Sequence, residues 1–169
     1  MNIFGQLAKH KVVEANNLNG LRNGHMVAQA KFDKKESGLD YLDNGHILAL
    51  DNKGELVLAG AGESAYFLHY SEEHIKFLDS ASLNMFTVPL DGDAYPRAIA
   101  LYEGDTFTTD NYDAGSADVN YPAAGEYKGV TVVDGVLTLG AVAKGEPIAK
   151  AATLPSGQKA IQVTWKGGL

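Results

Sequence analysis

Residues 127–144 read YKGVTVVDGVLTLGAVAK, and this stretch decides the fold class. Two short runs rich in β-branched residues flank the dipeptide Asp134-Gly135. An Asp-Gly pair in this setting predicts a two-residue type I′ turn, because that turn needs a positive φ at both central positions. The alternation within each run favours a β-ribbon over a helix of this length. The stretch therefore predicts a β-hairpin, and no candidate catalytic residue lies on it.

Short apolar runs separated by turn residues recur along the rest of the chain. Glycine makes up 19 of 169 residues, an excess that indicates many tight turns. A second hairpin is predicted at residues 49–60, ALDNKGELVLAG, around an Asp-Asn-Lys-Gly turn. This pattern predicts a mainly β protein with at most one or two short helices, built as an antiparallel β sandwich or a small β-barrel. Further strands are expected at residues 11–15, 65–70, 85–90, 97–102, 104–109 and 159–165.

The expected organisation is a short N-terminal arm followed by two β subdomains. The arm covers residues 1–10, the first subdomain residues 11–90, and the second residues 91–169, which include the central hairpin at 128–144. The boundary falls near Asp91–Tyr95, and the two halves could also form one continuous domain. Residues 16–23 are crowded with Asn and Gly and are predicted to be a loop. Ser71, followed by two glutamates, is predicted to cap a short helical turn.

Composition excludes several classes of function. The chain has no cysteine, which rules out disulfides, thiolate metal sites and cysteine nucleophiles. No apolar run approaches the ~20 residues that span a bilayer, and no signal peptide is visible, so a soluble protein without membrane contact is expected. Residues 1–35 carry a net charge of +4 and residues 36–169 a net charge of −11. Because so acidic a body repels phosphate backbones, nucleic-acid binding is not expected.

No catalytic, metal or cofactor site is predicted. In the motif HYSEEH, His69 and His74 stand five residues apart, whereas the histidines of a zinc site on a helix stand four apart. Both are therefore expected to be surface or turn histidines. Acidic pairs occur along the chain and are weak candidates for calcium, but none matches the EF-hand loop pattern. Trp165, on the last expected strand, is predicted to be a core residue. The acidic pairs are Asp91/Asp93, Glu103/Asp105 and Asp110/Asp113.

The second half of the chain resembles proteins encoded beside the major capsid gene of tailed phages of Gram-positive hosts. Three segments carry the resemblance: residues 94–113 (AYPRAIALYEGDTFTTDNYD), residues 128–141 (KGVTVVDGVLTLGA) and residues 153–165 (TLPSGQKAIQVTW). They share a strand ending in G-D-x-F-T-T, a V-x-V-x-D-G-x-L-T hairpin and a closing P-x-G-x-K strand. The resemblance covers roughly residues 65–165.

This resemblance implies an auxiliary head protein, a decoration or cement protein that binds the outside of a phage capsid and stabilises it. Such proteins are β-rich, often oligomeric and not enzymes. The implied partners are the major capsid protein and further copies of this chain, and the implied location is the capsid surface of the virion after synthesis in the host cytoplasm. Three alternatives remain: a tail, neck or head-fibre protein, a carbohydrate-binding β module, and a small β enzyme.

Charge and aromatic content predict which residues contact a partner. The basic N-terminal residues, with Lys9, Lys11 and Arg22 foremost, are expected to meet an acidic surface on the capsid or on a neighbouring copy's residues 103–126. Residues 110–126 are expected to form a loop. Its Tyr112 and Tyr121 are either contact anchors, because tyrosine is enriched in interface hot spots, or pins that hold the loop to its own domain.

Overall fold

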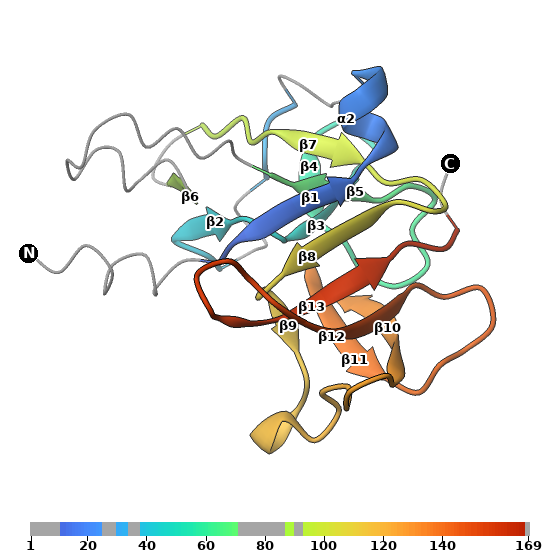
Figure 1. Ribbon diagram of the computed structural model, residues 1–169. Helices are drawn as coiled ribbons and strands as arrows, with labels where there is room; N and C mark the ends of the chain where they lie inside the picture. Colours follow the sequence, from blue (N-terminus) through green and yellow to red (C-terminus); the bar gives the residue numbers. More distant parts are fainter. Residues whose placement is uncertain (1–10, 25–29, 34–37, 71–86, 90–92, 168–169) are drawn as a thin grey trace, which may run out of the picture.

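The computed structural model describes residues 11–24, 30–33, 38–70, 87–89 and 93–167 (Figure 1). Over these residues the chain is mainly β, as predicted, and its strands form a seven-stranded, a four-stranded and a two-stranded sheet. The two larger sheets form a sandwich and do not close into a barrel. Of the two architectures expected from the sequence, the sandwich is therefore the correct one.

The seven-stranded sheet has the strand order β1-β8-β13-β12-β10-β11-β9. All neighbours in it are antiparallel except β11 and β9, which run parallel. The edge strand β9 has only two residues, so it covers little of β11. The strands are β1 (Val13–Asn17), β8 (Thr106–Thr109), β9 (Tyr112–Asp113), β10 (Tyr127–Val133), β11 (Val136–Gly140), β12 (Ile148–Thr153) and β13 (Lys159–Thr164).

Strands of the four-stranded sheet lie behind and above β1 in Figure 1, and the sheet is buried on both faces. Successive residues of a strand point to opposite faces, and here they enter two different apolar clusters. In β3, Ile47 joins the first cluster and Leu48 the second; in β5, Leu68 joins the first and Phe67 the second. Both faces are covered, which explains why these segments are apolar without alternation. The strands are, in order, β4 (Leu56–Leu58), β3 (Ile47–Leu50), β5 (Phe67–His69) and β7 (Ala98–Ala100).

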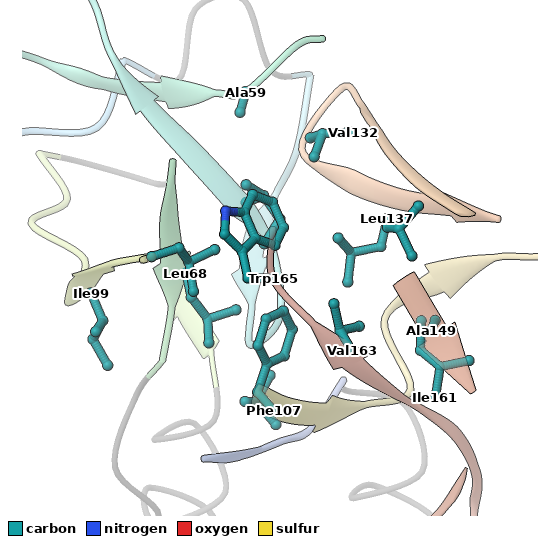
Figure 2. Close-up of a cluster of buried hydrophobic side chains, with 14 of the residues drawn as sticks. Ala59, Leu68, Ile99, Phe107, Val132, Leu137, Ala149, Ile161, Val163 and Trp165 are labelled. Carbon is teal, nitrogen blue, oxygen red and sulfur yellow. The ribbon is translucent and has the colours of Figure 1, made fainter. Parts of the chain in front are cut away.

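The first cluster, the main core, fills the space between the two large sheets (Figure 2). Leu68 and Ile99 enter it from the four-stranded sheet, and Phe107 and Val163 from the seven-stranded sheet. Trp165 lies at the centre of this core and is 1% exposed, which confirms the prediction that it is a core residue. The second cluster lies on the other face of the four-stranded sheet and includes Leu42 from the two-stranded sheet formed by β2 (Tyr41–Asp43) and β6 (Thr87–Pro89).

The predicted central hairpin is confirmed. Asp134 has φ 48° and Gly135 has φ 74°, the two positive values that a type I′ turn requires. The register runs from Val133 opposite Val136 to Gly129 opposite Gly140. The tip also docks on the other sheet, because the Gly135 N–H donates to the Ala59 carbonyl (2.8 Å) and the Gly135 carbonyl accepts from the Ile47 N–H (2.8 Å). The hairpin at residues 49–60 is confirmed as β3 and β4.

Strand pairing joins the two halves of the chain across the boundary expected near Asp91–Tyr95. β1, from the N-terminal half, pairs with β8 in the seven-stranded sheet. β7, from the C-terminal half, pairs with β5 in the four-stranded sheet. The main core likewise contains residues from both halves, and so the described strands do not divide at that boundary.

The prediction of a loop at residues 16–23 is wrong, because β1 extends to Asn17 and a short helix, α2 (Asn19–Asn23), follows. The helix has no side-chain cap from its own N-cap residue, Leu18. Its first N–H, on Asn19, instead donates to the Asp105 carboxylate (2.8 Å). The helix is followed by the C-cap residue Gly24, which has a φ of 69°. The helical turn expected after Ser71 and the arm at residues 1–10 lie outside the described residues.

Candidate interaction surfaces

The acidic loop at residues 110–126 is held against its own domain by the two tyrosines singled out above. The Tyr121 hydroxyl donates to the carbonyls of Ala160 (2.8 Å) and Ala152 (3.3 Å) on β13 and β12. The rings of Tyr112 and Tyr121 lie 5.8 Å apart, and both pack against the main core. Of the two roles expected for these tyrosines, the geometry therefore favours the pin over the contact anchor. The loop is not wholly irregular, because it contains β9 and the 3₁₀ turn η2 (Ser116–Asp118).

Lys159 on β13 also holds this loop, through contacts with Asp118 and Tyr121. Its Nζ forms an ion pair with Asp118 Oδ2 at 2.6 Å and lies 3.8 Å from the centroid of the Tyr121 ring. Burial raises the pKa of Tyr112 to about 12, and the neighbouring Tyr121 hydroxyl and Asp118 carboxylate act in the same direction. Both tyrosines thus belong to a packed, internally bonded loop.

Of the basic residues predicted to contact a partner, the structure describes Lys11, Arg22 and Lys31. Lys11 Nζ donates to the Asp110 carbonyl (3.1 Å), and the neighbouring Val12 N–H donates to Asp110 Oδ1. Lys11 thus meets the start of the acidic loop of its own chain. Arg22 is exposed in the last turn of α2, and Lys31 is paired with Asp93 at 2.8 Å. Lys9, Lys34 and Lys35 lie outside the described residues.

The G-D-x-F-T-T segment at residues 104–109 serves the fold. Asp105 is fully buried, and its carboxylate accepts hydrogen bonds from the N–H and the Nδ2 of Asn19 and from the N–H of Tyr102. Phe107 belongs to the main core, and Thr109 Oγ1 donates to the Val12 carbonyl at 2.8 Å. The motif is therefore explained by burial and hydrogen bonding and needs no ligand.

A buried polar cluster joins β3, β5 and the start of the acidic loop. Asn111 Nδ2 donates to the Asn44 carbonyl at 3.1 Å and lies 3.4 Å from His46 Nδ1. His69 is fully buried, with Nδ1 2.9 Å from the Arg97 carbonyl. Burial lowers the pKa of both histidines, that of His69 to about 4, although nearby carbonyl groups favour the protonated rings. The expectation that His69 is a surface or turn histidine is therefore wrong, because the residue sits inside the sandwich on β5.

No group of three or more His, Cys, Asp or Glu side chains that could hold a metal ion occurs among the described residues. The carboxylates of Asp105, Asp110 and Asp113 are engaged by backbone N–H groups of the chain itself. His74 and Asp91 lie outside the described residues. No helix in the described part of the chain is long and apolar enough to cross a membrane.

A pocket of about 260 Å³ opens between β10 and the segments around residues 61–66, 145–147 and 165–167. Its aromatic lining comes from Tyr66 and Trp165, whose rings meet edge to face at 5.3 Å. Trp165 is almost completely covered, and the Tyr66 hydroxyl accepts from the N–H groups of Gly62 and Glu63. The tryptophan therefore does not offer a flat aromatic surface to a ligand.

A further surface is the side of the seven-stranded sheet that faces away from the main core, here called the outer face, on which Thr108, Gly129 and Ala160 are buried. Its residues alternate along the strands with core residues such as Val130, Ile161 and Val163. Most of them are threonine, small or uncharged polar residues, and only Glu14, Asp113 and Lys150 are charged. Depletion of charge is a mark of protein-interface cores. By strand register the outer-face positions are Glu14, Asn17, Thr106, Thr108, Asp113, Tyr127, Gly129, Thr131, Val133, Val136, Thr138, Gly140, Ile148, Lys150, Ala152, Ala160, Gln162 and Thr164, and the Asn16 side chain reaches the same face by accepting a hydrogen bond from Thr108.

Sequence reasoning missed the outer face as a site. Its residues belong to no motif, and the only local signal is the alternation of polar and apolar residues within strands such as β10 and β13. That alternation indicates a solvent-facing side, but it does not say which residues of different strands become neighbours.

No protein-family model, curated protein sequence or solved structure matches this chain.

Proposed function

We propose that this protein is a structural virion protein that decorates and stabilises the capsid of a tailed phage. One observation carries the proposal: the three segments that resemble auxiliary head proteins meet in the seven-stranded sheet, and the first also supplies β7 to the four-stranded sheet. They supply five strands of the seven-stranded sheet, β8 and β9 from the first segment, β10 and β11 from the second, and β13 from the third. The residues of the shared pattern, such as Asp105 and Asp134-Gly135, each have a definite structural role in that sheet.

The proposed mechanism is mechanical and uses no catalysis. A decoration protein adds interface area across the seams between neighbouring capsid subunits. The added contacts help the shell to resist the outward pressure of the packaged DNA. A stable contact of this kind buries more than about 1,000 Å² in total. A sandwich whose two sheets share one continuous core, and whose second sheet is buried on both faces, supplies a stiff body for such a clamp. The proposed partners are the major capsid protein and neighbouring copies of this chain.

The shell contact is assigned to the side of the molecule that carries the second cluster. Tyr41 is 51% exposed next to the buried Leu42, and Tyr95 is 58% exposed next to the buried Ala94. Leu42 and Ala94 both belong to the second cluster, on the far side of the four-stranded sheet from the outer face. Tyrosine combines a large apolar ring with a polar tip and is enriched in interface hot spots. This assignment leaves the outer face turned toward the medium.

The experiment is a pelleting assay with phage capsids that lack the protein. Saturable binding at a fixed ratio to the major capsid protein is expected, and the ratio reports the symmetry of the site. The double variant Tyr41→Ser/Tyr95→Ser should bind about tenfold or more weakly, because it removes two large contact side chains. Tyr127→Ser, which changes an equally exposed tyrosine on the outer face, is the matched control and should bind normally.

The two parts of this proposal fail separately. Absence of wild-type binding to mature, expanded shells would reject decoration. Wild-type binding that the Tyr41→Ser/Tyr95→Ser variant retains would keep decoration and reject the assigned contact side. Circular dichroism and thermal melting of each variant establish that it is folded.

A further inference from the structure

A row of five side chains crosses the outer face at right angles to the strands. Tyr127 on β10 is the direct neighbour of Lys150 on β12, which is the neighbour of Gln162 on β13. The row continues through Thr108 on β8 to Glu14 on β1. Neighbouring strands lie about 4.8 Å apart, so these five strands give the row a length of about 19 Å. It is called here the cross-strand row.

A β-bulge brings a sixth polar residue to this row. The register between β1 and β8 shifts between Glu14 and Asn17, so that β1 holds one extra residue there. Bulges of this kind re-aim side chains and are frequent near functional sites. The extra residue lets the Asn16 side chain reach over β8 and β13, where its Oδ1 accepts from Thr108 Oγ1 (2.8 Å) and Gln162 Nε2 (3.5 Å). The amide of Asn16, itself exposed, is therefore held in place beside the row.

Apart from the buried Thr108, the row is accessible, and it is nearly neutral. Tyr127 is 52% exposed, Lys150 and Asn16 are exposed, and Glu14 and Gln162 are half-buried. β1, β8 and β13 form the side of the molecule turned to the viewer in Figure 1. One lysine and one glutamate balance each other along the row, whereas the whole chain carries −7. Such a surface neither attracts polyanions nor repels neutral polar polymers.

We propose that the cross-strand row is a binding site for a neutral oligosaccharide. Sugar rings carry hydroxyl groups that both donate and accept hydrogen bonds, and apolar C–H faces that pack on aromatic rings. The row offers this combination: the amphipathic ring of Tyr127 at one end, and along it an ammonium donor, the amides of Asn16 and Gln162, and a carboxylate acceptor. The Asn16 Oδ1 is already used by Thr108 and Gln162, so Asn16 serves a sugar as a donor through its Nδ2. Its length suits a short oligosaccharide lying across the strands. Thr108, only 4% exposed, is a positioning residue that orients Asn16.

Other polymers fit this surface less well. An extended peptide binds a sheet along an edge, where unpaired main-chain groups give affinity, and not across the strands. A nucleic acid needs a positively charged track, and the row has a single lysine on a strongly acidic protein. A shell protein that covers the whole outer face is the competing occupant, and capsid pelleting of variants in the row distinguishes it from a sugar. The sugar-binding proposal does not depend on capsid decoration, since it concerns a different side of the molecule.

The experiment is titration calorimetry of the full chain with chitohexaose, cellohexaose, maltohexaose and a galactose-based hexasaccharide. Binding of at least one probe is expected. Tyr127→Ala and Gln162→Ala should each weaken it about tenfold or more, because they remove the aromatic platform and an amide at the centre of the row. Tyr95→Ala and Lys166→Ala, which remove an exposed tyrosine and an exposed lysine away from the row, are the matched controls and should leave it unchanged.

Thr108→Val separates positioning from simple loss of contact. It keeps the shape of the side chain, removes the hydroxyl that holds Asn16, and should weaken sugar binding while leaving the Tyr127 environment unchanged in an NMR spectrum. Failure of all four probes to bind at millimolar concentration would overturn the proposal. Sugar binding that stays unaltered in Tyr127→Ala and Gln162→Ala would also overturn it. Loss of capsid pelleting in these two variants would overturn it too, because the outer face would then be the contact with the shell.

Discussion

Asp105 holds Asn19 by two hydrogen bonds, one from the backbone N–H and one from Nδ2, both 2.8 Å long and both ending on Oδ1. The two residues stand 86 positions apart, so this contact ties α2 to the turn before β8. The other oxygen of Asp105 accepts from the Tyr102 N–H at 2.9 Å. One buried carboxylate thus satisfies the start of a helix and a tight turn at once.

Asp105→Ala should therefore lower the free energy of unfolding by about 2–4 kcal/mol, because it removes the buried acceptor of three part-buried donors. Urea denaturation measures the loss. Glu103→Ala, two residues earlier and exposed, is the control and should change stability by less than about 0.5 kcal/mol. Equal effects of the two substitutions would contradict the role given to Asp105.

Gly45→Ala should be strongly destabilising, by about 3 kcal/mol or more. A Cβ at Gly45 would lie 2.6 Å from Thr109 Oγ1 and 2.8 Å from Asn111 Cβ, and its φ is +87°. Gly54→Ala is a matched control, because Gly54 has φ +79° but open space around the position of a Cβ. The difference between the two melting temperatures isolates the cost of crowding the buried polar cluster. Similar melting temperatures would mean that the cluster can relax.

Stability should fall as the pH drops from about 6.5 toward 4. The unfolded chain protonates His69 near pH 6.5, whereas in the folded protein burial lowers the pKa of His69 to about 4. Between these values the unfolded state binds more protons, so acid favours unfolding, by an amount on the order of 3 kcal/mol at pH 4. Burial lowers the pKa of His46 as well, which adds to the trend.

Urea denaturation at pH 7.0, 5.5 and 4.5 measures this trend, and NMR titration of the imidazole protons assigns it to His69. His69→Gln removes the titrating ring, so the change in stability between pH 7.0 and 4.5 should shrink in the variant, whatever its stability at pH 7.0. An NMR pKa for His69 above 6 would refute the explanation.

Tyr121→Phe should cost about 1 kcal/mol of stability and leave capsid binding unchanged. The substitution removes a hydroxyl that donates to the carbonyls of Ala160 and Ala152 but keeps the ring against Tyr112 and beneath Lys159. Chemical denaturation and the pelleting assay are the two measurements, and Tyr127→Phe on the outer face is the control. Loss of capsid binding at unchanged stability would restore Tyr121 as a contact anchor.

Local features of the fold followed from the sequence, and features built on distant contacts did not. The turn at Asp134-Gly135 could be predicted because only a few residue types adopt its two positive φ values. The helix α2 was missed because its first N–H is satisfied by Asp105, far along the chain, and not by a local cap. Likewise, nothing near His69 in the sequence shows that β5 would be buried on both faces.

For the candidate sites, too, the sequence pointed to individual residues, and the tertiary structure was needed to show their roles. Tyr112 and Tyr121 could be singled out by composition, but only the packed structure shows that they hold the acidic loop to its own domain. The exposed Tyr127 belongs to the stretch that decides the fold class, yet its position gave no sign of a role on a surface.

By itself the sequence determined the mainly β class, the two hairpins and the burial of Trp165, because these depend on backbone preferences and side-chain polarity over a few neighbouring residues. Only the tertiary structure decided that β1 lies beside β8, and that Glu14, Thr108, Gln162, Lys150 and Tyr127 fall into one row. The register of each strand pair depends on how two segments bury their apolar sides together, and a shift of one residue would turn the row into the core. That choice is made by the whole sandwich and by no single segment.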